Sequence, residues 1–162
     1  MTFKRVRRGI FQSVCLLMLL VVPGTLSAQN KEDRVQRPKP TMSHTISTLL
    51  IRNLKDVFGE NDAARRRAAI DEIFTEECVF YDPMGGVYRG RDEIDRVAGA
   101  IRATHPDFRY QPIAGPEELG NGGRIQWVSG RPGEAPAYAG ADFIIARGGR
   151  IAALYLFFDK LP

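Results

Sequence analysis

The stretch AGADFIIARGGRIAALYLFFD, residues 139–159, decides the fold of this 162-residue chain. It belongs to two runs rich in residues that favour β-strands, residues 138–146 and 150–159, with the glycines of RGGR between them. A glycine pair at such a position is typical of the tight turn of a β-hairpin. The stretch therefore predicts two long antiparallel strands at the end of the chain.

Shorter strands are predicted upstream of this hairpin. Residues 108–113 and 124–130 form two β-prone runs, and GNGG marks the turn before the second. Another run, residues 78–81, is stopped by Asp82 and a proline, and a Gly-Gly pair then leads into the short piece at residues 87–89. Several short strands joined by glycine-marked turns predict an antiparallel sheet.

Three helices are predicted before most of these strands. An apolar stripe at spacings of three and four predicts the first, ending near Gly59. The stripe consists of Ile46, Leu49, Leu50, Leu54, Val57 and Phe58. Asn61 or Asp62 can cap a second helix, and a third begins after Gly90 and ends at Pro106. Helices that precede antiparallel strands indicate an α+β domain, with three helices packed on a curved, mostly antiparallel sheet around one pocket.

The composition of residues 1–43 differs from that of the predicted domain. Residues 1–28 combine a basic start, an apolar run and small residues, which predicts a signal peptide and an exported, periplasmic or secreted protein. Residues 29–43 are polar and contain prolines, which predicts a flexible linker before a domain at residues 44–162. The alternative is that Met42 is the true start.

The charge balance depends on that cleavage. Removing the four basic residues of the signal from the chain's 23 leaves 19, equal to the 19 acidic residues. We therefore expect neither a nucleic-acid partner nor a stable membrane anchor after cleavage. Cys78 is the only cysteine outside the signal, so no internal disulfide is expected. Two distant histidines and one thiol give no metal-ligand spacing, so no metal site is predicted. No cofactor is expected either.

Two aspartates and one histidine are the candidate catalytic residues. If Asp142 faces the pocket, burial within its strand raises its pKa; the alternative is that it faces solvent or accepts hydrogen bonds in a turn. Asp82 precedes a proline, where it can bond the following backbone or act as a general base at the pocket mouth. His105 is a reserve base, although a histidine at a helix end more often bonds the last carbonyls.

Several segments together resemble a known family. They are the paired opening helices, FTEECVFYDPMGGVYRG at residues 74–90, HPDF at residues 105–108, Trp127 in mid-strand, and residues 139–159. Their order is similar to the SnoaL-like and ketosteroid-isomerase-like members of the nuclear transport factor 2-like superfamily, over about residues 47–162. The resemblance implies a cone-shaped α+β barrel with one deep pocket, often dimerised through the outer face of the sheet.

The resemblance also implies roles for the aspartates. Asp82 looks like the proton-shuttling aspartate of ketosteroid isomerases, and Asp142 looks like their second aspartate, which stays protonated and donates a hydrogen bond to the oxyanion. Leu54 stands where those enzymes have an oxyanion tyrosine, and a tyrosine at position 81, 138 or 155 is the candidate substitute. The expected pocket-lining residues are Leu54, Tyr81, Trp127, Tyr138, Tyr155 and Phe157.

Three functions are consistent with these residues. The first is cofactor-free proton transfer on a small apolar carbonyl compound, by an isomerase, cyclase or dehydratase with Asp82 as base and Asp142 as acid. The second is a non-catalytic domain that binds a small apolar ligand or dimerises. The third is epoxide hydrolysis, which requires Arg109 or Arg124 to lie between two pocket carboxylates.

Overall fold

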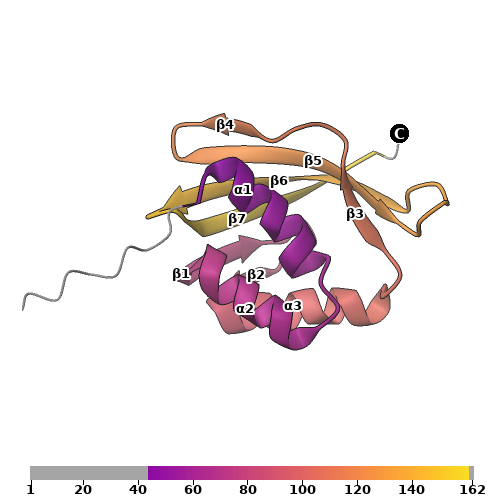
Figure 1. The fold of residues 1–162 in the computed structure, drawn as a ribbon, viewed down its shortest axis with the longest axis horizontal. Helices are drawn as coiled ribbons and strands as arrows, with labels where there is room; N and C mark the ends of the chain where they lie inside the picture. Colours follow the sequence, from indigo (N-terminus) through magenta and orange to yellow (C-terminus); the bar gives the residue numbers. More distant parts are fainter. Residues whose placement is uncertain (1–43, 161–162) are drawn as a thin grey trace, which may run out of the picture. The chain divides into compact units, whose positions relative to one another are not determined.

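The computed structural model describes residues 44–160 (Figure 1). The predicted signal peptide and linker, residues 1–43, lie outside the described residues. The elements follow one another as α1 (Ile46–Arg52), η1 (Asn53–Phe58), α2 (Ala63–Ile73), β1 (Phe74–Tyr81), β2 (Val87–Arg89), α3 (Arg91–Thr104), β3 (Arg109–Pro112), β4 (Glu117–Leu119), β5 (Gly122–Gly130), β6 (Tyr138–Arg147) and β7 (Arg150–Asp159).

The first two helices begin at side-chain caps. The hydroxyl of Thr45 accepts a hydrogen bond from the backbone N–H of Thr48, and the carboxylate of Asp62 accepts one from Arg65. The predicted first helix ends at Gly59 as expected, but its last six residues form the π-helical turn η1 rather than α-helix. The predicted apolar stripe is buried along both parts, which confirms that face of the helix.

All the predicted strands are present, in one seven-stranded sheet with the order β2-β1-β7-β6-β5-β3, and β4 pairs with β5. The predicted terminal hairpin is confirmed: β6 and β7 are antiparallel, and Gly148 and Gly149 turn the chain at φ of 59° and 71°. Only β1 and β7 pair in parallel, so the sheet is mostly antiparallel, as predicted. It is open, with β2 at one edge and β3 and β4 at the other.

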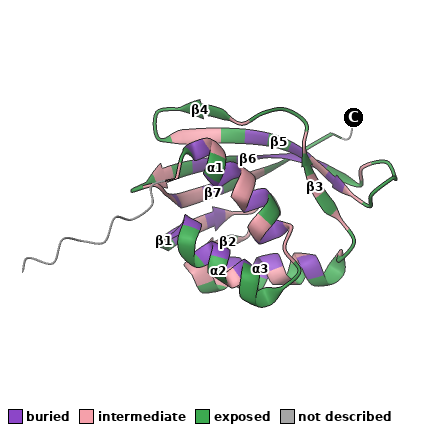
Figure 2. Ribbon diagram, in the orientation of Figure 1, coloured by how far each residue is buried: buried purple, intermediate pink, exposed green. Residues whose placement is uncertain are grey.

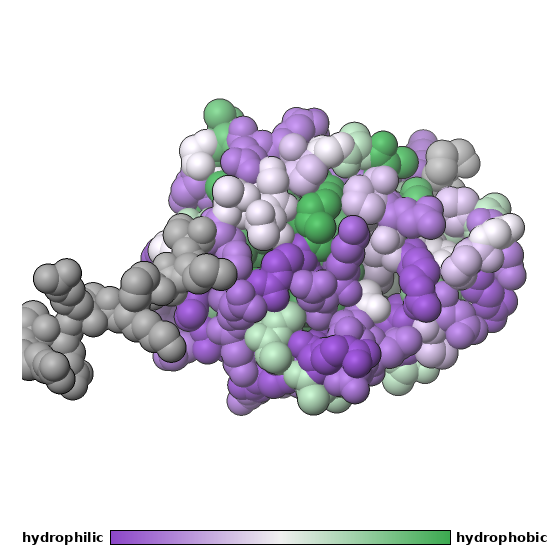
Figure 3. Space-filling model, in the orientation of Figure 1, coloured by the Kyte–Doolittle hydropathy of each residue, from purple (hydrophilic) through white to green (hydrophobic). Residues whose placement is uncertain are grey.

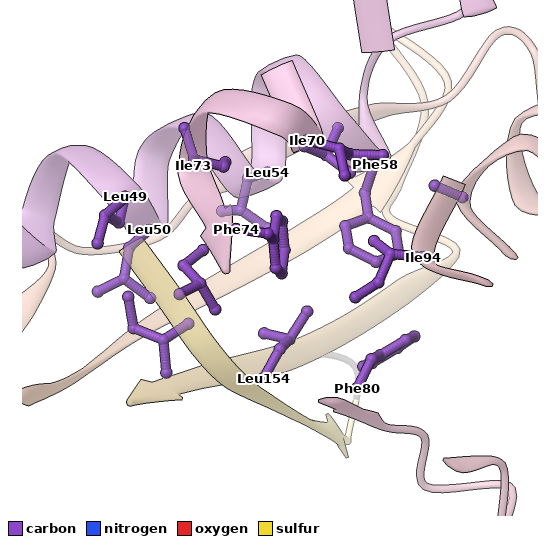
Figure 4. Close-up of a cluster of buried hydrophobic side chains, with 14 of the residues drawn as sticks. Leu49, Leu50, Leu54, Phe58, Ile70, Ile73, Phe74, Phe80, Ile94 and Leu154 are labelled. Carbon is purple, nitrogen blue, oxygen red and sulfur yellow. The ribbon is translucent and has the colours of Figure 1, made fainter. Parts of the chain in front are cut away.

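The helices cover one face of this sheet (Figure 1), and buried residues lie on both the helices and the strands (Figure 2). The core includes Leu50, Leu54, Ile70, Phe74 and Leu154, all almost completely buried. Figure 4 shows these side chains converging between the helices and the strands. The predicted α+β fold is therefore confirmed.

The outside of the domain is mixed. The face shown in Figure 3 is mostly hydrophilic, with apolar side chains gathered in small groups. None of the helices in the described part of the chain combines the length and the apolar character needed to cross a bilayer.

Candidate active site

A cavity of about 230 Å³ opens between the helices and the inner face of the sheet. Much of its wall is apolar, with Leu54 and Phe58 from η1 and Leu154, Leu156 and Phe158 from β7. Seven polar or charged residues also line it: Asp82, Arg102, His105, Tyr110, Ser129, Tyr138 and Asp142. An apolar cavity with a few inward polar groups is the usual form of a small-molecule site.

Asp142 is the more buried of the two carboxyl groups that line this wall. It lies in the middle of β6, is only 4% exposed, and faces the cavity rather than solvent. One carboxylate oxygen, Oδ1, accepts a hydrogen bond of 2.9 Å from the indole Nε1 of Trp127, and Oδ2 accepts one of 2.8 Å from Nδ2 of Asn53. Burial raises the pKa of Asp142 to about 7, against the two hydrogen bonds, which lower it.

Both hydrogen-bond donors depend on special local structure. Asn53 is completely buried in the first position of η1, and its Oδ1 has no partner among the described residues. Trp127 on β5 lies opposite Gly140 on β6. A Cβ atom at Gly140 would come within 2.8 Å of Cζ2 of Trp127 and 2.6 Å of a carbonyl oxygen, so glycine is needed for the indole to cross this strand.

Asp82 lies where β1 ends. It bonds the backbone of the turn that follows, and it also lines the cavity. Its Oδ1 accepts a hydrogen bond of 2.7 Å from the backbone N–H of Met84, and its own N–H donates to the carbonyl of Gly86. This is the turn role of an aspartate before proline. The residue also lines the cavity, and its Oδ2 has no donor among the described residues. One oxygen is therefore available to accept a proton.

The inner face of the sheet carries a row of three hydroxyl groups. Tyr110 on β3 pairs with Ser129 on β5, which pairs with Tyr138 on β6, and all three line the cavity. Burial raises the pKa of Tyr110 to about 12, helped by the negative charge of Asp142 and opposed by the positive charge of Arg102. Its hydroxyl therefore stays neutral and can donate a hydrogen bond.

Tyr110 was not among the residues selected from the sequence. Of the tyrosines considered as substitutes for the family's oxyanion tyrosine, only Tyr138 lines this cavity. The signal that could have identified Tyr110 is its place in the strand before Trp127, since the two side chains share a face and their rings lie 5.0 Å apart.

Three of the predicted lining residues lie elsewhere. Leu54, Trp127 and Tyr138 line the cavity as predicted, but Tyr81, Tyr155 and Phe157 lie on the opposite, outer face of the sheet. The rings of Tyr81 and Tyr155 stack there at 4.6 Å. The prediction was wrong because residues alternate between faces, and the β7 residue opposite Asp142 is Leu156.

Of the remaining predicted residues, His105 lines the cavity, whereas Arg109 and Arg124 do not. His105 lines the cavity where α3 ends, and its ring stacks on that of Phe108 at 4.4 Å. Arg124 instead forms an ion pair of 2.9 Å with Glu117 outside the cavity. Neither Arg124 nor Arg109 lines the cavity, so neither of these two arginines lies between its carboxylates. Within residues 44–160, no three His, Cys, Asp or Glu side chains are grouped to hold a metal ion.

Comparisons with known proteins find a family and a fold similar to those of this chain. The model of the SnoaL-like domain family matches residues 52–154. A candidate isomerase of the SnoaL-like family from Agrobacterium tumefaciens is 25% identical with a TM-score of 0.66, covering 71% of this chain and 97% of that one. A candidate polyketide cyclase from Sinorhizobium meliloti is 19% identical with a TM-score of 0.53, covering 68% and 94%.

A third solved structure, a candidate ketosteroid isomerase from Kribbella flavida, is 13% identical with a TM-score of 0.56 and covers 72% of this chain and 79% of that one. At identities below 25% these likenesses show the fold alone. No curated protein matches the sequence.

Proposed function

This chain belongs to the SnoaL-like domain family, and from that premise we propose that it catalyses a cofactor-free proton transfer on a small apolar carbonyl compound. The reaction is that of an isomerase, a cyclase or a dehydratase. The family resemblance noted in the sequence is thereby confirmed, whereas the reaction is our proposal. A fold alone does not establish an activity, so the proposal depends on the site.

The observation that carries the proposal is the buried carboxyl group of Asp142. A general acid is most effective when its pKa is close to the working pH, and burial raises the pKa of Asp142 to about 7. Trp127 and Asn53 fix the orientation of the carboxyl group in the cavity wall. Fixed hydrogen bonds at a buried ionisable group that faces a cavity are typical of catalytic sites.

The other polar groups of the wall fit a two-carboxyl mechanism. Protonated Asp142 donates a hydrogen bond to the substrate carbonyl oxygen, and the neutral hydroxyl of Tyr110 is a second donor. Asp82 removes a proton from the carbon next to the carbonyl, the electron pair of that C–H bond forms a C=C bond, and the C=O pair moves onto the oxygen to give an enolate held by the two donors. The proton then returns from Asp82 to carbon, at the same position or at another.

The size of the cavity limits the substrate. An apolar protein cavity of about 150 Å³ accommodates benzene. The cavity found here, at about 230 Å³, has room for one six-membered ring with substituents. We therefore propose a substrate with a single ring, of the size of a substituted cyclohexanone.

Solvent deuterium exchange tests the reaction directly. Cyclohexanone and its methyl derivatives are incubated with the protein in D₂O, and NMR follows loss of the protons next to the carbonyl. We expect catalysed exchange by the wild type, loss of it in Asp142→Asn and Asp82→Asn, and full retention in the control Asp159→Asn, an exposed residue outside the cavity. The proposal is contradicted if Asp142→Asn exchanges at the wild-type rate, or if the wild type itself catalyses no exchange.

The outer face of the sheet favours a second, non-catalytic function, which is the association of two copies of the chain. The outer sheet surface, defined by Phe143, Ile145, Tyr155 and Phe157, holds large apolar side chains that are 37–52% exposed. Contiguous exposed apolar groups of this kind mark interaction sites. We propose that two copies of the chain associate through it as a homodimer.

Sedimentation analysis tests this association. We expect Phe157→Ser to shift the protein to monomers, whereas Leu119→Ser, at a more exposed position on β4, leaves the dimer intact. A wild-type protein that sediments as a monomer contradicts the proposed dimer.

Export is a separate proposal that depends on the sequence alone. We propose that residues 1–28 are removed on export to the periplasm or the medium. Mass analysis of the protein from its native host should then give a chain beginning near Gln29. A chain that retains residues 1–28 contradicts cleavage, and one that begins at Met42 supports the later start.

A further inference from the structure

One buried charged residue that lines the cavity, Arg102, has no role in the mechanism proposed above. Two arginines are buried in the described part of the chain, Arg66 and Arg102. Arg66 donates a hydrogen bond of 2.7 Å to the carboxylate of Asp95. Arg102, which is only 3% exposed, has no carboxylate partner among residues 44–160. A charge removed from water without a counter-ion is costly, so this arginine requires an explanation.

The hydrogen bonds of Arg102 are all made to neutral oxygens. Its Nε donates to Oδ1 of Asn61 at 2.7 Å, Nη1 donates to the carbonyl of Phe108 at 3.0 Å, and Nη2 donates to the carbonyl of Pro106 at 2.6 Å. These bonds fix the end of α3 to the loop that follows it and to Asn61, which lies before α2. A guanidinium group has five N–H bonds, so one on each terminal nitrogen has no acceptor in the described chain.

The surroundings of Arg102 place this charge in the cavity. Arg102 lines the cavity together with Tyr110 and Ser129. The pKa of Tyr110 is raised by the charge of Asp142 and lowered by that of Arg102, so its hydroxyl is within electrostatic reach of both. Burial lowers the pKa of Arg102, although an arginine remains charged at neutral pH. The cavity therefore contains an unpaired cation as well as the carboxyl group of Asp142.

We propose that the cavity binds a ligand whose carboxylate pairs with Arg102, so that among small cyclic ketones the preferred substrate is one that carries a carboxylate. Arginine is suited to this role because two of its N–H groups can bind both oxygens of one carboxylate. The ring of the ligand then lies along the apolar wall with its carbonyl toward Tyr110 and Asp142. Only this last point rests on the proposed function; recognition of the carboxylate does not.

A pair of ligands that differ in charge tests the proposal. Trp127 is the only tryptophan of the chain and lines the cavity, so its fluorescence reports binding without turnover. The probes are 4-oxocyclohexanecarboxylate and its methyl ester, titrated at pH 6 into the purified protein. We expect the acid to bind at least about tenfold more tightly than the ester, an amount typical of one charged hydrogen-bonded contact.

Variants assign this preference to the arginine. We expect Arg102→Gln to remove the preference for the acid, and the control Arg109→Gln, an exposed arginine outside the cavity, to retain it. Circular dichroism establishes whether Arg102→Gln is folded; if it is not, the acid and ester affinities of the wild type decide. Equal affinities, binding of neither probe, or a preference that survives in folded Arg102→Gln overturns the proposal.

The same probes separate this proposal from the proposed function. Asp142→Asn should lose deuterium exchange and keep the preference for the acid. If the wild type catalyses exchange but binds the acid and the ester equally, only the role of Arg102 is contradicted. A preserved preference without exchange in the wild type contradicts only the catalytic role of Asp142.

Discussion

Replacing Asp142 by asparagine should change how the stability of the domain depends on pH. The native pKa of Asp142 is about 7, against an ordinary value of 3.8. Between these two values the native state holds a proton that the unfolded state has released, so the free energy of unfolding falls as pH rises. One unit of pKa corresponds to about 1.4 kcal/mol, so the loss from pH 4 to pH 8 is about 4 kcal/mol.

Asparagine has nearly the same shape and stays neutral at every pH. Wild type and Asp142→Asn should therefore have similar stabilities near pH 4, and the variant should be more stable by up to about 4 kcal/mol at pH 8. Urea denaturation at several pH values measures this, and the difference between the two proteins removes the contribution of all other groups. Parallel pH dependences would refute the reasoning, because they would mean that Asp142 is already ionised near pH 4 in the native state.

Three further substitutions test the structure around this carboxyl group. Asn53→Ala removes a donor that favours the ionised form of Asp142, so the pKa of that group should rise further, as a carboxyl titration by NMR would show. Gly140→Ala should displace the ring of Trp127 and destabilise the domain by about 1–3 kcal/mol; unchanged urea stability and Trp127 fluorescence would contradict this. Leu54→Ala should cost about 2–5 kcal/mol of unfolding free energy and enlarge the cavity, with a smaller cost indicating that the helix collapses into the space.

Most of the fold could be predicted because its periodic patterns are strong. The stripe of the first helix is regular, and the glycines of the terminal hairpin mark its turn directly. The strand at residues 117–119 was missed because its sequence, EEL, is exposed throughout and shows no alternation. The π-helical turn of η1 gives no periodic signal, since an ordinary helix would leave nearly the same apolar stripe.

The site was harder to predict than the fold. Alternation placed Asp142 on one face of its strand, but the sequence could not show which face the helices cover. Asn53 could have been found, because it occupies an inward position seven residues after Ile46, where a polar residue is unusual. The role of Arg102 could not have been predicted, because its burial depends on carbonyl groups of the loop that follows α3.

The central claim is that the protein holds Asp142 as a neutral acid close to physiological pH. The most direct test is an NMR titration of the Asp142 side-chain carboxyl carbon, assigned by comparison with Asp142→Asn. We predict a midpoint near 7. A midpoint near 4 would contradict the claim, because Asp142 would then be ionised at neutral pH and could not donate a proton to a substrate.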